Sequence, residues 1–177
     1  MAKEVVEEKK SIKEYIKELI PYVVILVIVV LFRTFIATPV IVSGPSMNPT
    51  LNSGELMILF KRSKIERFDI VVVNNGKEDI IKRVMALPGE TISCEDGKWY
   101  VNDRLQEEEY SKKTEYCTPS GKKTFDKIKL KDDEYFVLGD NRMNSADSRE
   151  YGPFDSKHVK GKSDFVLFPF KNFGKVK

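Results

Sequence analysis

The sequence predicts a mostly β, barrel-like domain that follows a single N-terminal transmembrane helix. Three observations lead to this prediction. An unbroken apolar stretch lies near the N-terminus, short runs of strand-forming residues recur after it, and no long amphipathic helix pattern follows position 40. We divide the 177 residues into an N-terminal segment 1–18, a membrane helix 19–38 and one globular domain 39–177, which is long enough to bury a core.

The apolar stretch from Leu19 to Ala37 would rise roughly 28 Å as a helix, close to the ~30 Å hydrocarbon core of a bilayer. Its one charge, Arg33, lies near the outer end, where the side chain can reach the interface. A buried core helix and a cleaved secretory signal are the alternatives, but the stretch is long and no good small-residue cleavage site follows it. Ser11 opens a Ser-x-x-Glu pattern, which predicts a short helix that meets Pro21 at the membrane surface.

The positions of lysine and arginine predict the orientation of the span. Several lysines precede it, whereas none of either residue follows Arg33 until Lys61, so the N-terminus should be cytoplasmic and residues 39–177 extracytoplasmic. Cys94 and Cys117 would then both lie where a disulfide can persist, although a reducing habitat would leave them free.

Seven runs of strand type are expected in the domain, separated by clusters of Asn, Gly and Pro that predict turns. The runs are residues 40–42, 56–60, 69–73, 79–85, 98–101, 136–138 and 165–168. The stretch 91–129 is more charged and contains both cysteines, which indicates a hairpin insertion or small subdomain outside the main core.

Composition and motif content exclude several classes of function. The 30 basic and 27 acidic residues give a net charge of +3, which offers no sign of a nucleic-acid partner. His158 is the one histidine, so a Ser/His/Asp triad would depend on this residue alone. The histidine and two cysteines are too few to supply the ligands of a structural zinc site or of a His-rich metal site. A carboxylate metal site stays open but has no support. No Walker-type phosphate loop or dinucleotide fingerprint is present.

One serine and one lysine are candidates for nucleophilic chemistry. Gly44 and Pro45 let the chain turn sharply after an apolar strand and present Ser46 at the strand end. A lysine can replace histidine as the base if burial destabilises its ammonium, and strand alternation in residues 79–85 gives Lys82 apolar neighbours. Lowering a lysine pKa from about 10.4 to 7 or 8 takes roughly 4 kcal/mol, which burial can supply. A turn serine and an edge-strand lysine are the alternative interpretations.

Four blocks of sequence resemble, in order, the sequence boxes of bacterial type I signal peptidases, and the preceding membrane anchor fits that family too. The blocks are Gly44–Leu51, Arg67–Val73, Ile81–Glu90 and Gly139–Arg149. The resemblance is to the short, Gram-positive-like form. It implies a signal-peptidase-type β-barrel-like fold and a membrane-bound serine endopeptidase that removes signal peptides from exported preproteins after Ala-x-Ala-like sites. It also implies that Ser46 is the nucleophile, that Lys82 is the general base, and that no metal or cofactor takes part.

The same resemblance assigns supporting roles. The backbone N–H of Ser46 would be one oxyanion-hole donor, whereas Gly44 stands where part of the family has a serine as the second. Ser145 matches a serine that orients the lysine, and Asp147 and Arg149 match a charge pair that shapes the loop around the site. Five apolar residues match the walls of shallow pockets for small side chains at substrate positions −1 and −3, although core packing is an equally simple role for them: Val40, Val42, Met47, Leu51 and Ile81.

The implied partners are preprotein signal peptides and membrane lipid, with the protein-export machinery as a further one and no nucleic acid. The implied location is the cytoplasmic membrane of a bacterium, with a single span. The SOS-repressor family resembles the domain in fold and dyad, but those chains have no such anchor. A catalytically inactive domain that captures extended peptides is the other alternative, and the presence of both Ser46 and Lys82 argues against it.

Overall fold

A computed structural model describes residues 12–111 and 114–176, and the chain divides into two units, one that ends at Ile36 and one that begins at Ala37. The first unit contains the helix α1 (Ile12–Phe35), and the second contains all the strands. Among the described residues, α1 is the one helix long and apolar enough to cross a membrane. Ser11, the predicted start of a separate short helix, lies outside the described residues.

The limits of α1 differ from the prediction. The structure has one continuous helix with Pro21 inside it, where we expected a short helix and then a span. Proline is tolerated within membrane-spanning helices more readily than in soluble ones. The helix ends at Phe35, and Ala37 already belongs to a strand, because Thr38 precedes Pro39 and a residue before proline disfavours helical backbone angles.

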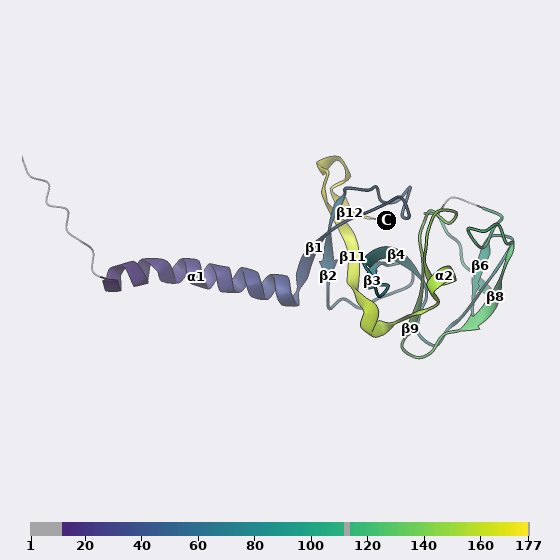
Figure 1. Cartoon of the computed structure of the whole chain (residues 1–177), viewed down its shortest axis with the longest axis horizontal. Coiled ribbons are helices and arrows are strands. Elements are labelled where there is room, and N and C mark those ends of the chain that lie inside the picture. Colours follow the sequence, from purple (N-terminus) through teal and green to yellow (C-terminus); the bar gives the residue numbers. More distant parts are fainter. Residues whose placement is uncertain (1–11, 112–113, 177) are drawn as a thin grey trace, which may run out of the picture. The chain divides into compact units, whose positions relative to one another are not determined.

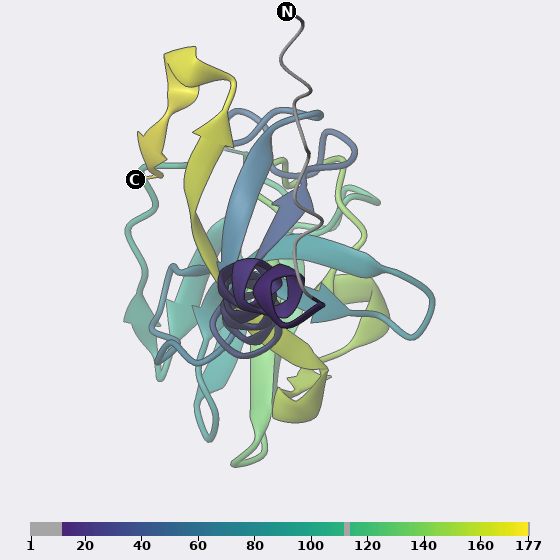
Figure 2. The same cartoon turned by 90° about the vertical axis from the view of Figure 1, so that its left-hand side faces the viewer.

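The larger sheet has eight antiparallel strands in the order β1-β2-β11-β3-β4-β9-β10, with β12 paired to β11. It curls into a half-barrel (Figure 1), which confirms the predicted fold class. The strands are β1 (Ala37–Ile41), β2 (Leu56–Phe60), β3 (Ile70–Asn74), β4 (Asp79–Ala86), β9 (Glu134–Leu138), β10 (Phe154–Asp155), β11 (Val159–Phe168) and β12 (Gly174–Lys175). Figure 2 shows the hairpin of β11 and β12, in yellow, projecting from this sheet.

A second, four-stranded sheet has the order β7-β6-β5-β8 and covers the range in which we expected an insertion. Its strands are β5 (Thr91–Glu95), β6 (Lys98–Val101), β7 (Arg104–Leu105) and β8 (Thr124–Lys129). Cys94 on β5 and Cys117 form a disulfide that attaches the loop before β8 to this sheet. Short helices complete the domain: α2 (Ser148–Tyr151), η1 (Ser156–His158) and η2 (Phe170–Asn172).

The core consists of three apolar clusters, and β3 and β4 lie between them. Alternate residues of β3 enter different clusters, because successive side chains on a strand point to opposite faces: Ile70 and Val72 enter one, Val71 and Val73 another. The third cluster, which includes Trp99 and Phe136, fills the space between β4, β9 and the second sheet. Strand β4 is therefore buried on both faces, and any charged side chain at its centre has to be buried with it.

Candidate active site

Ser46 and Lys82 meet although 36 residues separate them in sequence: Lys82 Nζ lies 2.8 Å from Ser46 Oγ. Ser46 is in the turn that follows β1, and Lys82 is at the centre of β4, opposite Val71 of β3. Lys82 Nζ also donates a hydrogen bond to the carbonyl oxygen of Ile81 at 3.0 Å. The hydroxyl and the amine are thus within reach of direct proton transfer.

The electrostatic environment favours a neutral amine on Lys82. The side chain is only 3% exposed, and this burial lowers the pKa of Lys82 from 10.5 to about 8. The negative charges of Asp147, Glu78 and Asp140 act in the opposite direction, and the positive charge of Arg149 adds to the lowering. Near pH 8 about half of the lysines would therefore be neutral, which is the form that a general base requires.

The segment Gly139–Asn141 holds the serine turn by hydrogen bonds to its backbone. Asn141 N donates to the carbonyl of Ser46 at 3.0 Å, and Asn141 Nδ2 donates to the carbonyl of Pro45 at 3.1 Å. Gly139 packs so closely that a Cβ there would lie 2.2 Å from Ser145 Oγ and 2.5 Å from Ser46 O. Position 139 therefore has no room for a side chain.

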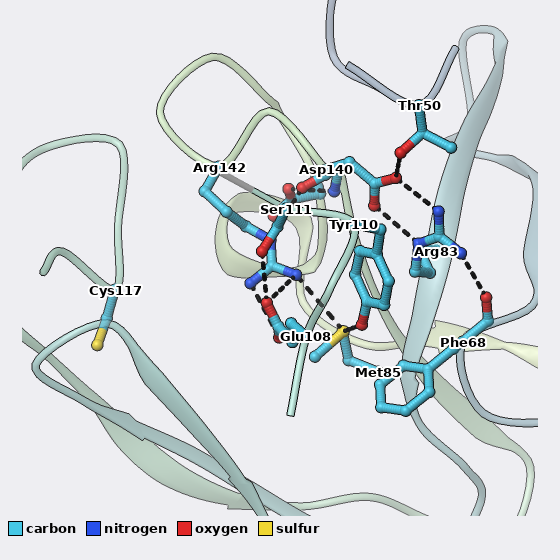
Figure 3. A network of polar contacts seen from close by, with 12 residues as sticks. Thr50, Phe68, Arg83, Met85, Glu108, Tyr110, Ser111, Cys117, Asp140 and Arg142 are labelled. Carbon is cyan, nitrogen blue, oxygen red and sulfur yellow. Dashed lines mark hydrogen bonds and ion pairs between the residues drawn. The ribbon is translucent and has the colours of Figure 1, made fainter. Parts of the chain in front are cut away.

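Asp140 ties the serine turn to β4. Its fully buried carboxylate accepts hydrogen bonds from Thr50 Oγ1 at 2.6 Å and from Arg83 Nε and Nη2 at 2.9 and 2.7 Å (Figure 3). Arg83 Nη1 also donates to the carbonyl of Phe68 at 2.8 Å. Because Arg83 follows Lys82 directly, this bidentate pair fixes the strand that carries the base as well as the turn that carries the nucleophile.

Asp147 and Arg149 form a second bidentate ion pair, with Arg149 Nε and Nη2 at 2.8 and 2.7 Å from the carboxylate oxygens. Asp147 also accepts from Gly139 N at 3.0 Å, and Arg149 Nη1 donates to the carbonyl of Cys117 at 3.3 Å. Ser145 differs from the expectation. Its buried hydroxyl has no hydrogen-bond partner among the described residues, because Lys82 Nζ is directed to Ser46 and Ile81 instead.

A cavity of about 300 Å³ opens beside the dyad. Its wall consists of Ile41, Ser43, Gly44, Ser46, Glu78–Lys82, Ala146 and Tyr151. Of the five expected pocket residues, Ile81 lies in this wall. The other four share its apolar cluster: Val42, Met47 and Leu51 are buried in it, and Val40 packs against it. Gly44, at the position of the uncertain second oxyanion donor, uses its N–H on Ser53 Oγ at 3.3 Å.

Sequence reasoning did not identify Thr50, Arg83, Gly139, Asp140 or Asn141 as parts of the site. Gly139–Asn141 was expected only as a turn between strands. The available signal was their position inside the blocks Gly44–Leu51, Ile81–Glu90 and Gly139–Arg149, which together contribute nearly all the contacts described above.

Sequence comparison with known proteins gives matches over almost the whole chain. The model of the family described as signal peptidase, peptidase S26, matches residues 12–168. Signal peptidase I of Bacillus amyloliquefaciens is 36% identical over 184 residues, which cover 99% of this chain and 98% of that protein. Signal peptidase I S of Bacillus subtilis is 37% identical over 190 residues, which cover 99% of this chain and 100% of that protein. A crystal structure of a signal peptidase I from Enterococcus faecalis is 30% identical, with a TM-score of 0.47 over 56% of this chain and 97% of that chain.

Proposed function

The chain belongs to the signal peptidase family, peptidase S26, and we propose that Ser46 and Lys82 are the nucleophile and the general base with which it removes signal peptides from preproteins. The observation that carries this assignment is the 2.8 Å contact between Ser46 Oγ and a buried lysine amine whose pKa is lowered to about 8. Burial makes the amine a base at moderate pH, and the contact places it on the proton that it has to remove.

The reaction would proceed in two halves. As Ser46 Oγ attacks the carbonyl carbon of the −1 residue, its proton passes to Lys82 Nζ, and the backbone N–H of Ser46 stabilises the negative charge that develops on the carbonyl oxygen. The Lys82 ammonium then donates this proton to the nitrogen of the +1 residue, the C–N bond breaks and the mature protein leaves. In the second half, water attacks the ester, gives one proton to Lys82 and releases the signal peptide, and Ser46 regains its hydrogen.

The substrate position follows from the cavity and the cluster beside it. An extended peptide between the turn of Ser46 and β4 would direct its −1 and −3 side chains the same way, with −2 directed outward. The apolar cluster that contains Val42, Met47, Leu51 and Ile81 is closely packed, so only a small side chain would fit against it. We therefore assign Ala-x-Ala-like cleavage sites to this chain.

Helix α1 anchors the protein in the membrane, and we assign its N-terminal end to the cytoplasmic side and residues 37–177 to the extracytoplasmic side of a bacterial cytoplasmic membrane. Membrane lipid would then surround α1. The protein-export machinery that delivers preproteins to this face would be a neighbouring partner.

Cleavage of a fluorogenic peptide with an Ala-x-Ala site by the full-length protein in detergent tests the dyad. Ser46→Ala, Lys82→Ala and Lys82→Arg should each abolish cleavage, because the nucleophile and the base act as one unit and a guanidinium keeps its proton. Ser156→Ala and Lys64→Ala are matched controls at exposed positions outside the site and should keep wild-type rates. The assignment is wrong if Ser46→Ala retains a tenth of wild-type turnover while the fluorescence of Trp99 shows the same fold.

A further inference from the structure

A short segment that follows the second sheet's strand β7 reaches into the network around the dyad. Residues Gln106–Ser111, here called the strap, follow β7 and lie beside two buried arginines, Arg83 and Arg142 (Figure 3). We propose that Glu108 and Tyr110 of the strap are positioning residues for cleavage, which act through these arginines to hold Ser46 against Lys82. This inference rests on the proposed dyad.

Glu108 acts through Arg142. The two side chains form a bidentate ion pair, with Nη2 to Oε2 at 2.8 Å and Nη1 to Oε1 at 3.1 Å, and Ser111 Oγ donates to the same carboxylate at 2.7 Å. Arg142 is 3% exposed, and its Nε donates to the carbonyl of Gly139 at 3.0 Å. Because a planar guanidinium held at two nitrogens cannot rotate freely, Glu108 fixes the donor that fixes Gly139.

Tyr110 acts through Arg83. Arg83 Cζ lies over the Tyr110 ring, 3.9 Å from the ring centroid, while the guanidinium nitrogens bond to Asp140 and to the carbonyl of Phe68. The ring also packs against that of Phe68 at 5.5 Å between centroids. The aromatic ring thus covers one face of the guanidinium, where no N–H points, and it helps to exclude water from the pair with Asp140.

Both contacts converge on the segment that carries the serine turn. Arg142 holds Gly139 and Arg83 holds Asp140, while Asn141 bonds to the carbonyl of Ser46. Arg83 is balanced by a buried carboxylate and Arg142 by a partly buried one, so removal of Glu108 would leave the charge of Arg142 without its partner. A shift of the Gly139–Asn141 segment would move Ser46 relative to Lys82, and a misplacement near 1 Å can cost roughly 100-fold in rate.

The strap does not line the cavity beside the dyad. Loss of its contacts with the arginines should therefore affect the chemical step and not substrate binding. We expect Glu108→Gln and Tyr110→Leu each to lower kcat about tenfold and to change KM less than twofold. Tyr110→Phe should restore kcat to within twofold of wild type, because the ring stays on Arg83 and only the contact of the hydroxyl with Met85 Sδ is lost.

Phe125→Leu is the matched control, because Phe125 is a partly buried aromatic residue of the second sheet that packs on Trp99 and Phe136 instead of on the arginines. It should lower the thermal midpoint and leave kcat within twofold. The measurements are kcat and KM for one Ala-x-Ala peptide, and Trp99 fluorescence to show that each variant is folded. If Tyr110→Leu does not fold, Glu108→Gln decides, since it keeps the shape of the side chain.

Two outcomes would overturn the proposal: kcat within twofold of wild type in folded Glu108→Gln, or an equal loss of kcat in Phe125→Leu at the same loss of stability. Residual cleavage by Ser46→Ala in the same assay would instead refute the dyad, so the two failures are distinguishable.

Discussion

Replacing Lys82 with methionine should abolish cleavage and also stabilise the fold at neutral pH. Lys82 is 3% exposed, and burial lowers its pKa from 10.5 to about 8. This difference corresponds to about 3 kcal/mol of destabilisation of the charged form, at about 1.36 kcal/mol for each pKa unit. Methionine has a similar length and no charge. After allowance for the lost contacts with Ser46 and Ile81, the free energy of unfolding should rise by about 1–3 kcal/mol at pH 7.

The pH dependence of this gain is the decisive measurement. Above about pH 10.5 Lys82 is neutral in the folded and in the unfolded chain, so folding does not bury a charge and this cost in free energy disappears. As the pH falls toward 8, the unfolded chain binds a proton that the folded chain does not, and the wild type progressively loses stability. Below pH 8 the destabilisation of the wild type by buried Lys82 reaches its full value. The advantage of the methionine variant should therefore shrink by about 3 kcal/mol between pH 7 and pH 10.5.

Urea unfolding of both full-length proteins in detergent, followed by the fluorescence of the single tryptophan, Trp99, would measure this difference. Trp99 is 2% exposed, so its emission should change when the domain unfolds. Other groups that titrate in this range cancel in the comparison of the two proteins. A difference that stays constant from pH 7 to pH 10.5, or a variant less stable than wild type at pH 7, would refute this account of Lys82.

Four further outcomes can be measured with the same protein. The kcat/KM of the wild type should rise with pH through about 8 and fall about tenfold for each pH unit below it, since only neutral Lys82 accepts the proton; a flat profile from pH 6 to pH 9 would contradict this. Glu78→Gln should move that limb to lower pH, because the negative charge of Glu78 raises the pKa of Lys82, and an opposite movement would be inconsistent with the electrostatics. In a peptide series, Phe at −1 should nearly stop cleavage of an Ala-x-Ala site while Phe at −2 should not, and equal sensitivity at both positions would exclude the pocket assignment. Replacing Cys94 and Cys117 together with serine should lower the free energy of unfolding by about 3 kcal/mol and change kcat less than twofold, as urea unfolding and peptide cleavage would reveal.

Strands were predictable where apolar residues carried the pattern. The runs 56–60 and 98–101 coincide with β2 and β6, the run 69–73 is shifted by one residue from β3, and the run 79–85 ends one residue before β4 does. Strands β5 and β8 were missed because Thr91–Glu95 and Thr124–Lys129 mix polar and charged residues with few apolar ones. Such segments become strands through pairing with partners distant in sequence, and no local pattern records that pairing.

The same limit applies to the site. Ser46 and Lys82 could be identified from their local sequence and from the four blocks. The distance between them could not be predicted. Two of the ion pairs leave no local trace, since Arg83 and Asp140 are 57 residues apart and Arg142 and Glu108 are 34 apart. The role of Ser145 came from resemblance alone, and among the described residues its buried hydroxyl has no hydrogen-bond partner.

The neighbours Lys82 and Arg83 show how one strand can bury two basic side chains that have different roles. Both are 3% exposed, and adjacent side chains on a strand leave on opposite faces. A guanidinium cannot give up its proton, so Arg83 can be buried only with a carboxylate, and Asp140 meets it with two hydrogen bonds. An amine can become neutral, and the described partners of Lys82 are both uncharged, a hydroxyl and a carbonyl. Exchanging the two residues would therefore fail twice: a permanent charge would face Ser46 without a counter-ion, and a flexible ammonium would replace the rigid fork that fits Asp140.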